Sequence, residues 1–108
     1  MTAKSEFDAA YFTLLRAREE LEILVRYAEY LEAEQQRLEA FTAETRERMD
    51  DISRKVIRPI AGTTKPLFEA VGRRRSAVMD ERRRMADRLA NAQRFVEECE
   101  LEVDTLRR

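Results

Sequence analysis

Apolar residues recur every seven positions along most of this chain, and that repeat strongly limits what it can fold into. Two series of them, three or four positions apart, run through each half. In the first half they are Phe7, Ala10, Leu14, Ala17, Leu21, Leu24, Ala28, Leu31, Leu38, Met49, Ile52 and Val56. In the second half they are Phe68, Val71, Val78, Met85, Leu89, Ala92, Val96, Cys99, Val103 and Leu106. Such a repeat is typical of long helices that pair along one apolar seam.

The repeat is interrupted between Arg58 and Pro66, where both prolines and one of the two glycines occur. A proline disfavours the helical conformation of the residue before it, and a glycine can adopt a left-handed conformation after a helix end. Ser5 and Asp8 resemble a capping box at the start of the first helix. The sequence therefore predicts one domain, residues 1–108, with helices at about 5–57 and 65–107 and a turn at 58–65.

Two other arrangements compete with this hairpin. One is a continuous parallel coiled coil, which Pro59 and Gly62 disfavour. The other is a three-helix chain with a further break between Phe41 and Thr45. A composition with 40% charged residues, 7% aromatic residues and two glycines suits long solvated helices in each case. We predict an all-α fold, a long antiparallel helical hairpin whose open ends assemble into a dimeric four-helix bundle.

A turn centred between Thr63 and Thr64 predicts the pairing of the two helices. The numbers of facing residues then sum to 127. The predicted layers are Val56 with Val71, Met49 with Val78, Leu38 with Leu89, Leu31 with Val96, Ala28 with Cys99, Leu24 with Val103 and Leu21 with Leu106. In this register Phe7, Ala10, Leu14 and Ala17 have no partner within the chain.

Polar residues occupy some seam positions near the middle of each helix: Gln35, Thr42, Thr45, Arg75 and Arg82. In the predicted register Arg82 faces Thr45, whereas Arg75 faces the apolar Ile52. Polar residues at such positions commonly specify the register and the number of helices at some cost in stability.

Apolar residues outside the seam gather near the open end, as expected of an interface. The predicted self-association or partner surface comprises Phe7, Tyr11, Phe12, Leu14, Leu15, Ile23, Val25, Tyr27, Tyr30 and Phe95. Three explanations stay open: two hairpins pack together there, a different protein covers the surface, or the second helix of the natural protein continues beyond Arg108.

Charge is distributed unevenly. Residues 51–90 carry 11 Lys or Arg and 5 Asp or Glu, whereas residues 1–50 carry 7 and 12. The candidate anion-binding tip comprises Arg54, Lys55, Arg58, Lys65, Arg73, Arg74, Arg83 and Arg84. Such a cluster is often a solvated helical face, and otherwise it attracts nucleic-acid phosphates, lipid head groups or an acidic protein.

The chain lacks the residues that several classes of chemistry require. The chain has no histidine, which excludes imidazole-dependent nucleophile systems and the usual imidazole metal ligands. No acidic residue falls on the seam, and the segment from Ala61 to Lys65 lacks the spacing of a phosphate-binding loop. We therefore expect no enzyme activity, no cofactor and no metal. The single Cys99 and the absence of a long apolar run favour the cytoplasm.

The function class that fits these observations is a non-enzymatic coiled-coil structural or adaptor protein that self-associates as a homodimer and holds protein partners. One alternative is a nucleic-acid-associated protein that binds phosphate backbones through the basic tip. The other is a coiled-coil subunit whose apolar end docks on a larger protein machine.

Overall fold

The computed structural model describes residues 2–52 and 54–108, and it describes no side chains for 54–61 or for Thr63. The chain is an all-α helical hairpin built from α1 (Ala3–Asp50) and α2 (Arg54–Arg107). The described residues contain no strand. Ala, Leu, Glu and Arg, which are strong helix formers, dominate both helices and favour their length.

The first helix begins slightly earlier than predicted. Thr2 precedes the first residue of α1, and its Oγ1 accepts a hydrogen bond from the Ser5 backbone N–H at 3.2 Å. The Thr2 carbonyl accepts the first helical bond from the Glu6 N–H at 3.0 Å. Thr2 rather than Ser5 is therefore the capping residue, because its side chain satisfies one of the amides that the first turn leaves without a helical partner.

The predicted turn at 58–65 is wrong, since α1 ends at Asp50 and α2 begins at Arg54. Asp50 and Asp51 place two negative charges at the carboxyl end of α1, where the helix dipole disfavours them. The Ile52 N–H then bonds to the Met49 carbonyl at 3.1 Å in a tighter turn. α2 includes both prolines, and Gly62 has no positive φ.

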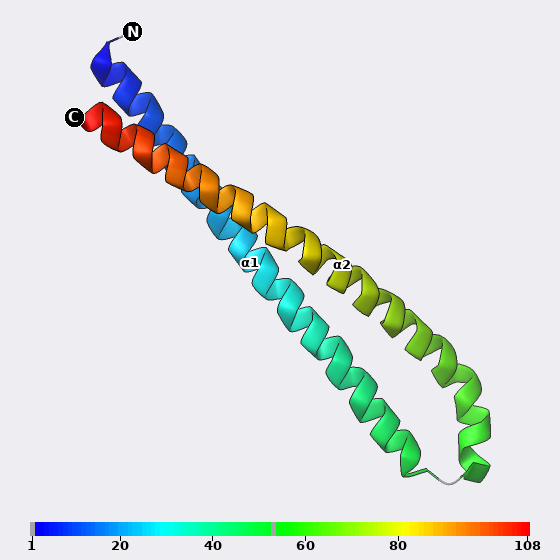
Figure 1. The fold of residues 1–108 in the computed structure, drawn as a ribbon. Coiled ribbons are helices and arrows are strands. Elements are labelled where there is room, and N and C mark those ends of the chain that lie inside the picture. The colour runs from blue at the N-terminus through cyan, green and yellow to red at the C-terminus, as the bar shows by residue number, and fades with distance from the viewer. Residues whose placement is uncertain (1, 53) are drawn as a thin grey trace. The chain divides into compact units, whose positions relative to one another are not determined.

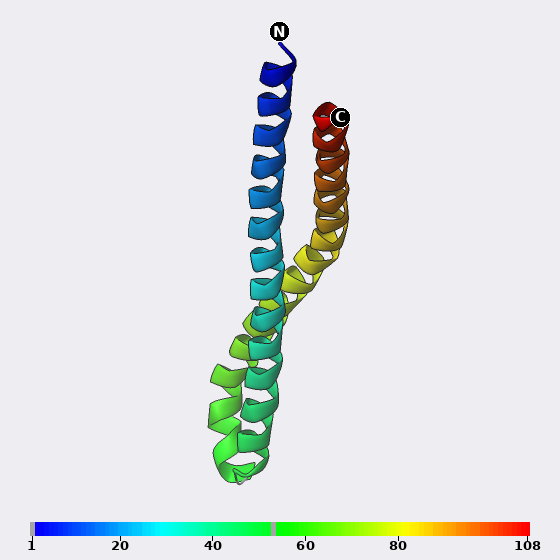
Figure 2. The same ribbon diagram turned by 90° about the vertical axis from the view of Figure 1, so that its left-hand side faces the viewer.

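The hairpin divides into two compact units. The terminal unit comprises Met1–Glu29 with Arg83–Arg108, and the turn unit comprises Tyr30–Arg82. Within the terminal unit the first part of α1, blue, runs beside the last part of α2, red (Figures 1 and 2). Each unit thus pairs one stretch of α1 with one stretch of α2.

The seam prediction is confirmed by burial. The buried hydrophobic residues of the described chain are Ala10, Leu14, Leu31, Val78, Met85, Val96, Cys99 and Val103. All eight belong to the two predicted seams. No polar or charged residue among those that the structure describes is buried. The sevenfold repeat therefore identifies the face that each helix turns toward the other.

The pairing register differs from the predicted one in both units. In the terminal unit the numbers of Arg18 and Glu100, which form an ion pair, sum to 118 rather than 127. In the turn unit the numbers of Arg75 and Glu39 sum to 114. Both sums are smaller than 127, as expected because the turn between the helices lies earlier in the chain than predicted.

Candidate self-association surface

The terminal unit has its own apolar core between the two helices. Its buried members are Ala10 and Leu14 from α1 and Val96, Cys99 and Val103 from α2, with Phe7, Ala17 and Leu21 packed against them. Phe7 and Leu14 therefore have partners within the chain, contrary to the prediction. Leu14 is only 3% exposed. These two residues do not belong to a free surface.

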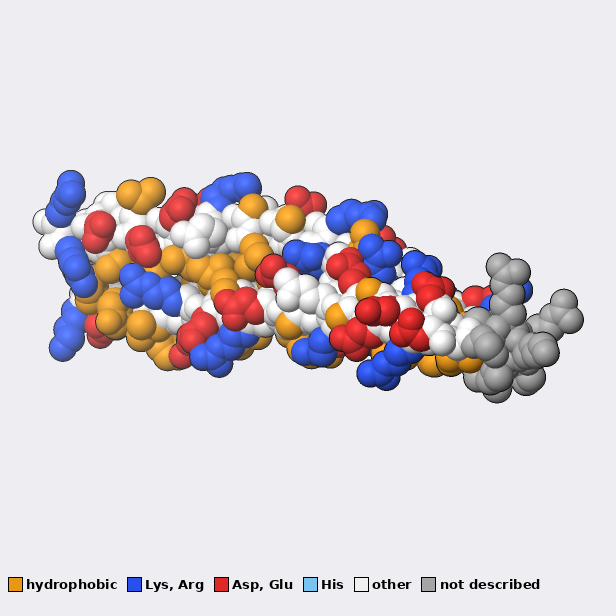
Figure 3. All heavy atoms as spheres, turned by 90° about the horizontal axis from the view of Figure 1, so that it is seen from below, with side chains coloured by type: hydrophobic (Ala, Val, Ile, Leu, Met, Phe, Trp, Pro, Cys, Tyr) orange, Lys and Arg blue, Asp and Glu red, His pale blue; other side chains and the backbone are white. Residues whose placement is uncertain are grey.

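The other predicted interface residues are exposed to solvent. They are Tyr11, Phe12, Leu15, Ile23, Val25, Tyr27, Tyr30 and Phe95. Tyr30 belongs to the turn unit and the other seven to the terminal unit. Figure 3 shows hydrophobic side chains gathered along the line between the helices, at the end of the view farthest from the grey residues. The exposed residues of the terminal unit lie on two different flanks of its core.

One flank carries polar and aromatic contacts around a mainly polar recess of about 300 Å³. An Arg18 Nη2 lies 3.5 Å from a Glu100 carboxylate oxygen across the two helices. The Arg107 guanidinium carbon lies 5.8 Å from the centre of the Phe7 ring, which stacks on Tyr11 at 6.0 Å. Tyr11 and Leu15 are four residues apart on this side of α1, so they lie on one helix face.

The opposite flank carries a groove of about 330 Å³ whose lining is mainly apolar. Its lining comes from both helices: Thr13, Arg16, Ala17, Glu20 and Leu24 on α1, with Ala92 and Phe95 on α2. Phe95 is 42% exposed at the border of the groove. Ile23 and Tyr27 lie seven residues beyond Arg16 and Glu20, so they continue the α1 wall of the same flank. We call this surface the open flank.

Arg16 and Glu20 were absent from the predicted surface because the prediction considered apolar residues alone. Their spacing from Thr13, Ile23 and Tyr27 is three or four residues at each step, which is the helical signal for a shared face. That signal was present in the sequence. The groove itself depends on the register, because Ala92 and Phe95 face Leu24 and Ala17 only in the observed pairing.

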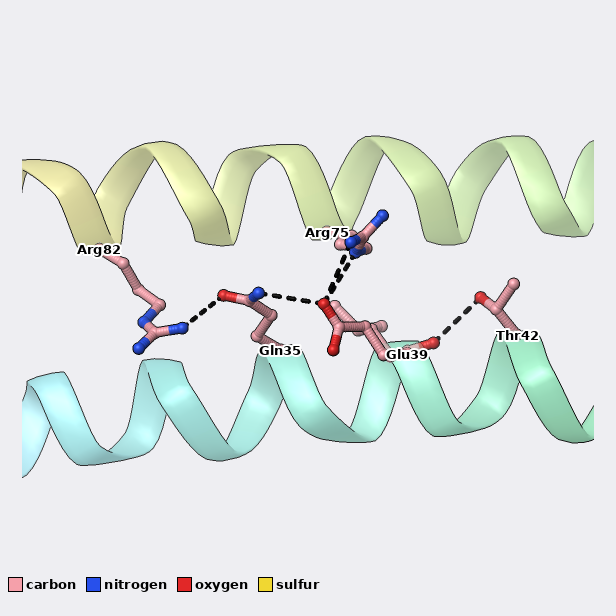
Figure 4. Close-up of polar contacts among 6 residues, drawn as sticks. Gln35, Glu39, Thr42, Arg75 and Arg82 are labelled. Atoms are coloured by element: carbon pink, nitrogen blue, oxygen red, sulfur yellow. Dashed lines mark hydrogen bonds and ion pairs between the residues drawn. The ribbon is translucent and has the colours of Figure 1, made fainter.

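The turn unit buries Leu31 and Val78, and it also has a polar seam formed by side chains of both helices (Figure 4). Arg82 Nη1 donates to Gln35 Oε1 at 2.7 Å, and Gln35 Nε2 donates to Glu39 Oε1 at 3.0 Å. Arg75 Nε donates to the same glutamate oxygen at 3.2 Å. The Thr42 hydroxyl donates a hydrogen bond to the Leu38 carbonyl within α1. The predicted pairs, Arg82 with Thr45 and Arg75 with Ile52, are therefore wrong.

Two carboxyl groups of this seam are perturbed. The hydrogen bond from Arg37 lowers the pKa of Glu34 below its usual value, and Arg74 contributes in the same direction. The hydrogen bond from Gln35, followed by that from Arg75, lowers the pKa of Glu39. Both shifts favour the ionised carboxylates that hold the two helices of this unit together.

Most residues of the candidate anion-binding tip either interact within the chain or have side chains that the structure does not describe. The side chains of Arg54, Lys55 and Arg58 are among those not described. Arg74 Nε lies 3.4 Å from Glu34 Oε1. Arg83 and Arg84 also interact within the chain. Lys65 and Arg73 are exposed, and Lys65 lines a recess with Met49, Thr64, Phe68 and Glu69. Phosphate binding at this tip stays a prediction.

Three further observations concern the described residues alone. Cys99 is buried and unpaired, and its burial, with Glu102 and Glu98 nearby, raises the pKa of the thiol. Among the described residues, no cluster of acidic residues or cysteine could hold a metal ion. The same part of the chain includes no helix that is long and apolar enough to span a membrane.

Comparisons with known proteins give no match: no family model, no curated protein and no solved structure is similar to this chain. The features of the chain that bear on function are the two flanks of the terminal unit and the polar seam of the turn unit.

Proposed function

We propose that this chain is a non-enzymatic coiled-coil structural or adaptor protein that self-associates through the open flank of its terminal unit and holds protein partners. One observation supports this proposal above the others: an apolar groove lies open beside exposed Phe95, Ile23 and Tyr27, although the core beneath it is closed. Contiguous exposed apolar surface of this kind marks interaction sites in soluble proteins.

The small core of the hairpin supports the same proposal. Eight hydrophobic residues are buried in the described part of a 108-residue chain. Small folds with little buried surface are marginally stable, and association is one of the ways in which they gain apolar burial. A second hairpin on the open flank would cover the groove and extend the apolar layers to a four-helix arrangement.

The polar seam supports a role in holding partners rather than in catalysis. Its arginine side chains pair with glutamate and glutamine side chains across the helices. The described residues of the seam therefore do not place an acid, a base and a nucleophile together around a cavity. Docking on a larger protein machine is the remaining alternative for the open flank. The buried, unpaired Cys99 suits a reducing compartment, and we propose the cytoplasm as the location.

Sedimentation equilibrium of the purified chain at micromolar concentration tests self-association directly. We expect the mass of a dimer. Replacing Ile23 and Tyr27 with Glu should give a monomer, because four charged side chains would be buried in the dimer interface. Circular dichroism should show that helix content is retained, since both side chains are exposed in the single chain.

Two matched variants locate the surface. Tyr11→Glu with Leu15→Glu introduces the same charges on exposed apolar residues of the other flank, and this variant should remain a dimer. Leu101→Glu, at a residue that is 67% exposed on α2, should also remain a dimer. A monomeric wild-type chain would overturn the proposal, and dissociation by the Tyr11 and Leu15 pair alone would move the surface to the other flank.

A further inference from the structure

The α1 wall of the open flank is a stripe of six residues that is complementary to itself. In chain order it reads Ala9, Thr13, Arg16, Glu20, Ile23 and Tyr27. Steps of four and three residues alternate along it, so all six lie on one face of the helix. Each residue is exposed. The stripe is therefore available to another helix along about five turns of α1.

The stripe pairs with its own reversed copy around a midpoint between Arg16 and Glu20. At the midpoint, a cation on one copy meets an anion on the other. One step outward, the small Thr13 meets the larger Ile23. The next step brings the smallest residue, Ala9, opposite the largest, Tyr27. Opposite charges and small-to-large contacts are the features expected of a twofold interface, in which the same patch contacts itself.

The two central charges have no partners of their own in the described part of the chain. No ion pair or hydrogen bond of Arg16 or Glu20 occurs among those residues. Arg18, two residues from Arg16, is by contrast paired with Glu100 on the other flank. Charge that is unpaired in the single chain and lies at the border of an apolar groove is available for pairing across an interface.

We propose that the occupant of the open flank is a second copy of this chain whose α1 packs antiparallel on α1, so that Arg16 of each copy meets Glu20 of the other. The inference rests on the proposed self-association and specifies its geometry. A parallel arrangement in register would bring Arg16 against Arg16 and Glu20 against Glu20, and like charges across an interface oppose association. The antiparallel arrangement forms two opposite-charge pairs around one twofold axis.

Charge reversal tests this geometry in four samples measured by sedimentation equilibrium. Glu20→Arg alone and Arg16→Glu alone should each weaken the homodimer about tenfold, because two exposed pairs change from attraction to repulsion. The double variant Arg16→Glu with Glu20→Arg should recover the wild-type dissociation constant. An equimolar mixture of the two single variants should form a heterodimer, because one chain then carries two cations and the other two anions.

Glu29→Arg is the matched control, since it makes the same charge change on an exposed side chain of α1 that is not three, four or seven residues from any member of the stripe. It should leave the dissociation constant within about twofold of wild type. Circular dichroism of every variant should show unchanged helix content. The measured quantity is the dissociation constant of the dimer and not the free energy of unfolding. In the double variant the side chains at positions 16 and 20 still attract each other within one helix, so they stabilise the single chain as well.

Two results separate this inference from the proposed function. A dimeric wild type whose single charge reversals associate as tightly as Glu29→Arg would overturn the antiparallel geometry and leave self-association standing. A monomeric wild type would overturn both. Weakening by both single variants without recovery in the double variant or the mixture would also overturn the direct pairing of Arg16 with Glu20.

Discussion

The two units of the hairpin use the same sevenfold repeat for different purposes. The terminal unit buries Ala10, Leu14, Val96, Cys99 and Val103 in an apolar cluster. The turn unit places hydrogen bonds and ion pairs across its seam. Apolar layers supply stability without distinguishing one register from the next. Polar layers supply little stability, but they are satisfied only when their partners are opposite each other.

The register of the turn unit illustrates this division. Arg82 donates to Gln35, another polar residue at a seam position. A shift of one heptad would separate Gln35 from Arg82, and both side chains would then hydrogen-bond to water instead of to each other. A comparable shift between two apolar layers would exchange one hydrophobic contact for another. The polar seam therefore provides the local discrimination that the apolar cluster lacks.

The largest expected effect comes from a disulfide that locks the terminal unit. Ala17 packs against the cluster that contains Cys99, so Ala17→Cys should form an intramolecular disulfide with the native cysteine on oxidation. The bridge would close a loop of about 80 residues and raise the free energy of unfolding by about 4 kcal/mol. Mass spectrometry of the oxidised monomer and urea denaturation measure the two results.

Ala28→Cys is the matched control for that experiment. Ala28 is also a partly buried alanine of α1, and it faces Cys99 only in the register whose sum is 127. It should give no intramolecular disulfide. The reverse outcome, with Ala28→Cys bridging and Ala17→Cys remaining reduced, would contradict the observed register.

The second effect removes apolar packing from the same unit. Leu14→Ala should lower the free energy of unfolding by about 3 kcal/mol, because the side chain is buried and its loss leaves a cavity. Leu101→Ala, at a solvent-exposed leucine, should change it by less than about 0.5 kcal/mol. Urea denaturation followed by circular dichroism compares them. Equal effects would show that the apolar cluster does not stabilise the terminal unit.

A smaller effect of opposite sign is expected in the turn unit. Gln35→Leu with Arg82→Leu should raise the free energy of unfolding by about 1 kcal/mol, because apolar pairs often stabilise more than polar ones at a seam. The register should become less specific. The yield of a disulfide between Met49→Cys and Phe68→Cys, in a Cys99→Ser background, should therefore fall.

Gln36→Leu with Arg73→Leu provides the comparison for those changes. It replaces the same residue types at exposed positions of the turn unit. Neither the urea midpoint nor the disulfide yield should change appreciably. A loss of stability in Gln35→Leu with Arg82→Leu would show that the polar seam stabilises the unit rather than specifying its register.

The smallest expected effect is a dependence of the free energy of unfolding on pH. Glu34 and Glu39 have a folded pKa below the ordinary value of 4.5, so their stabilisation is fully present above that pH. It is lost as the pH falls through the folded pKa, because the folded state must then bind protons that the unfolded chain already holds. Urea denaturation between pH 7 and pH 3 should show this loss. Glu34→Gln with Glu39→Gln should flatten the curve over the same range.

The fold was predictable because its signal is distributed over the whole chain. Each seam residue contributes independently to the sevenfold repeat, and an error at one position does not change the buried face. The turn depends on a few residues. The prediction placed the turn by Pro59 and Gly62 and did not consider Asp50 and Asp51, although two acidic residues at a helix end also favour termination.

The register was predictable in principle from a second criterion. Matching polar seam residues with one another brings Gln35 opposite Arg82, whereas the predicted register set Arg75 against the apolar Ile52. The residues assigned to the candidate surface depended on the predicted register. Phe7 and Leu14 were assigned to it because their partners were placed beyond the end of the chain. Ile23, Tyr27 and Phe95 were identified correctly as exposed, but their groove requires the pairing of two helices in space.

The separation in sequence between paired residues has a consequence for the order of folding. Contacts across the turn unit join residues that are 36, 40 and 47 positions apart, whereas Arg18 and Glu100 are 82 positions apart. Each doubling of a loop adds about 0.6 kcal/mol to the entropic cost of closing it. We therefore expect the polar turn unit to close first and the apolar terminal unit to follow. A nascent chain would then acquire its register before it acquires most of its stability, and the surface for a second copy would form last.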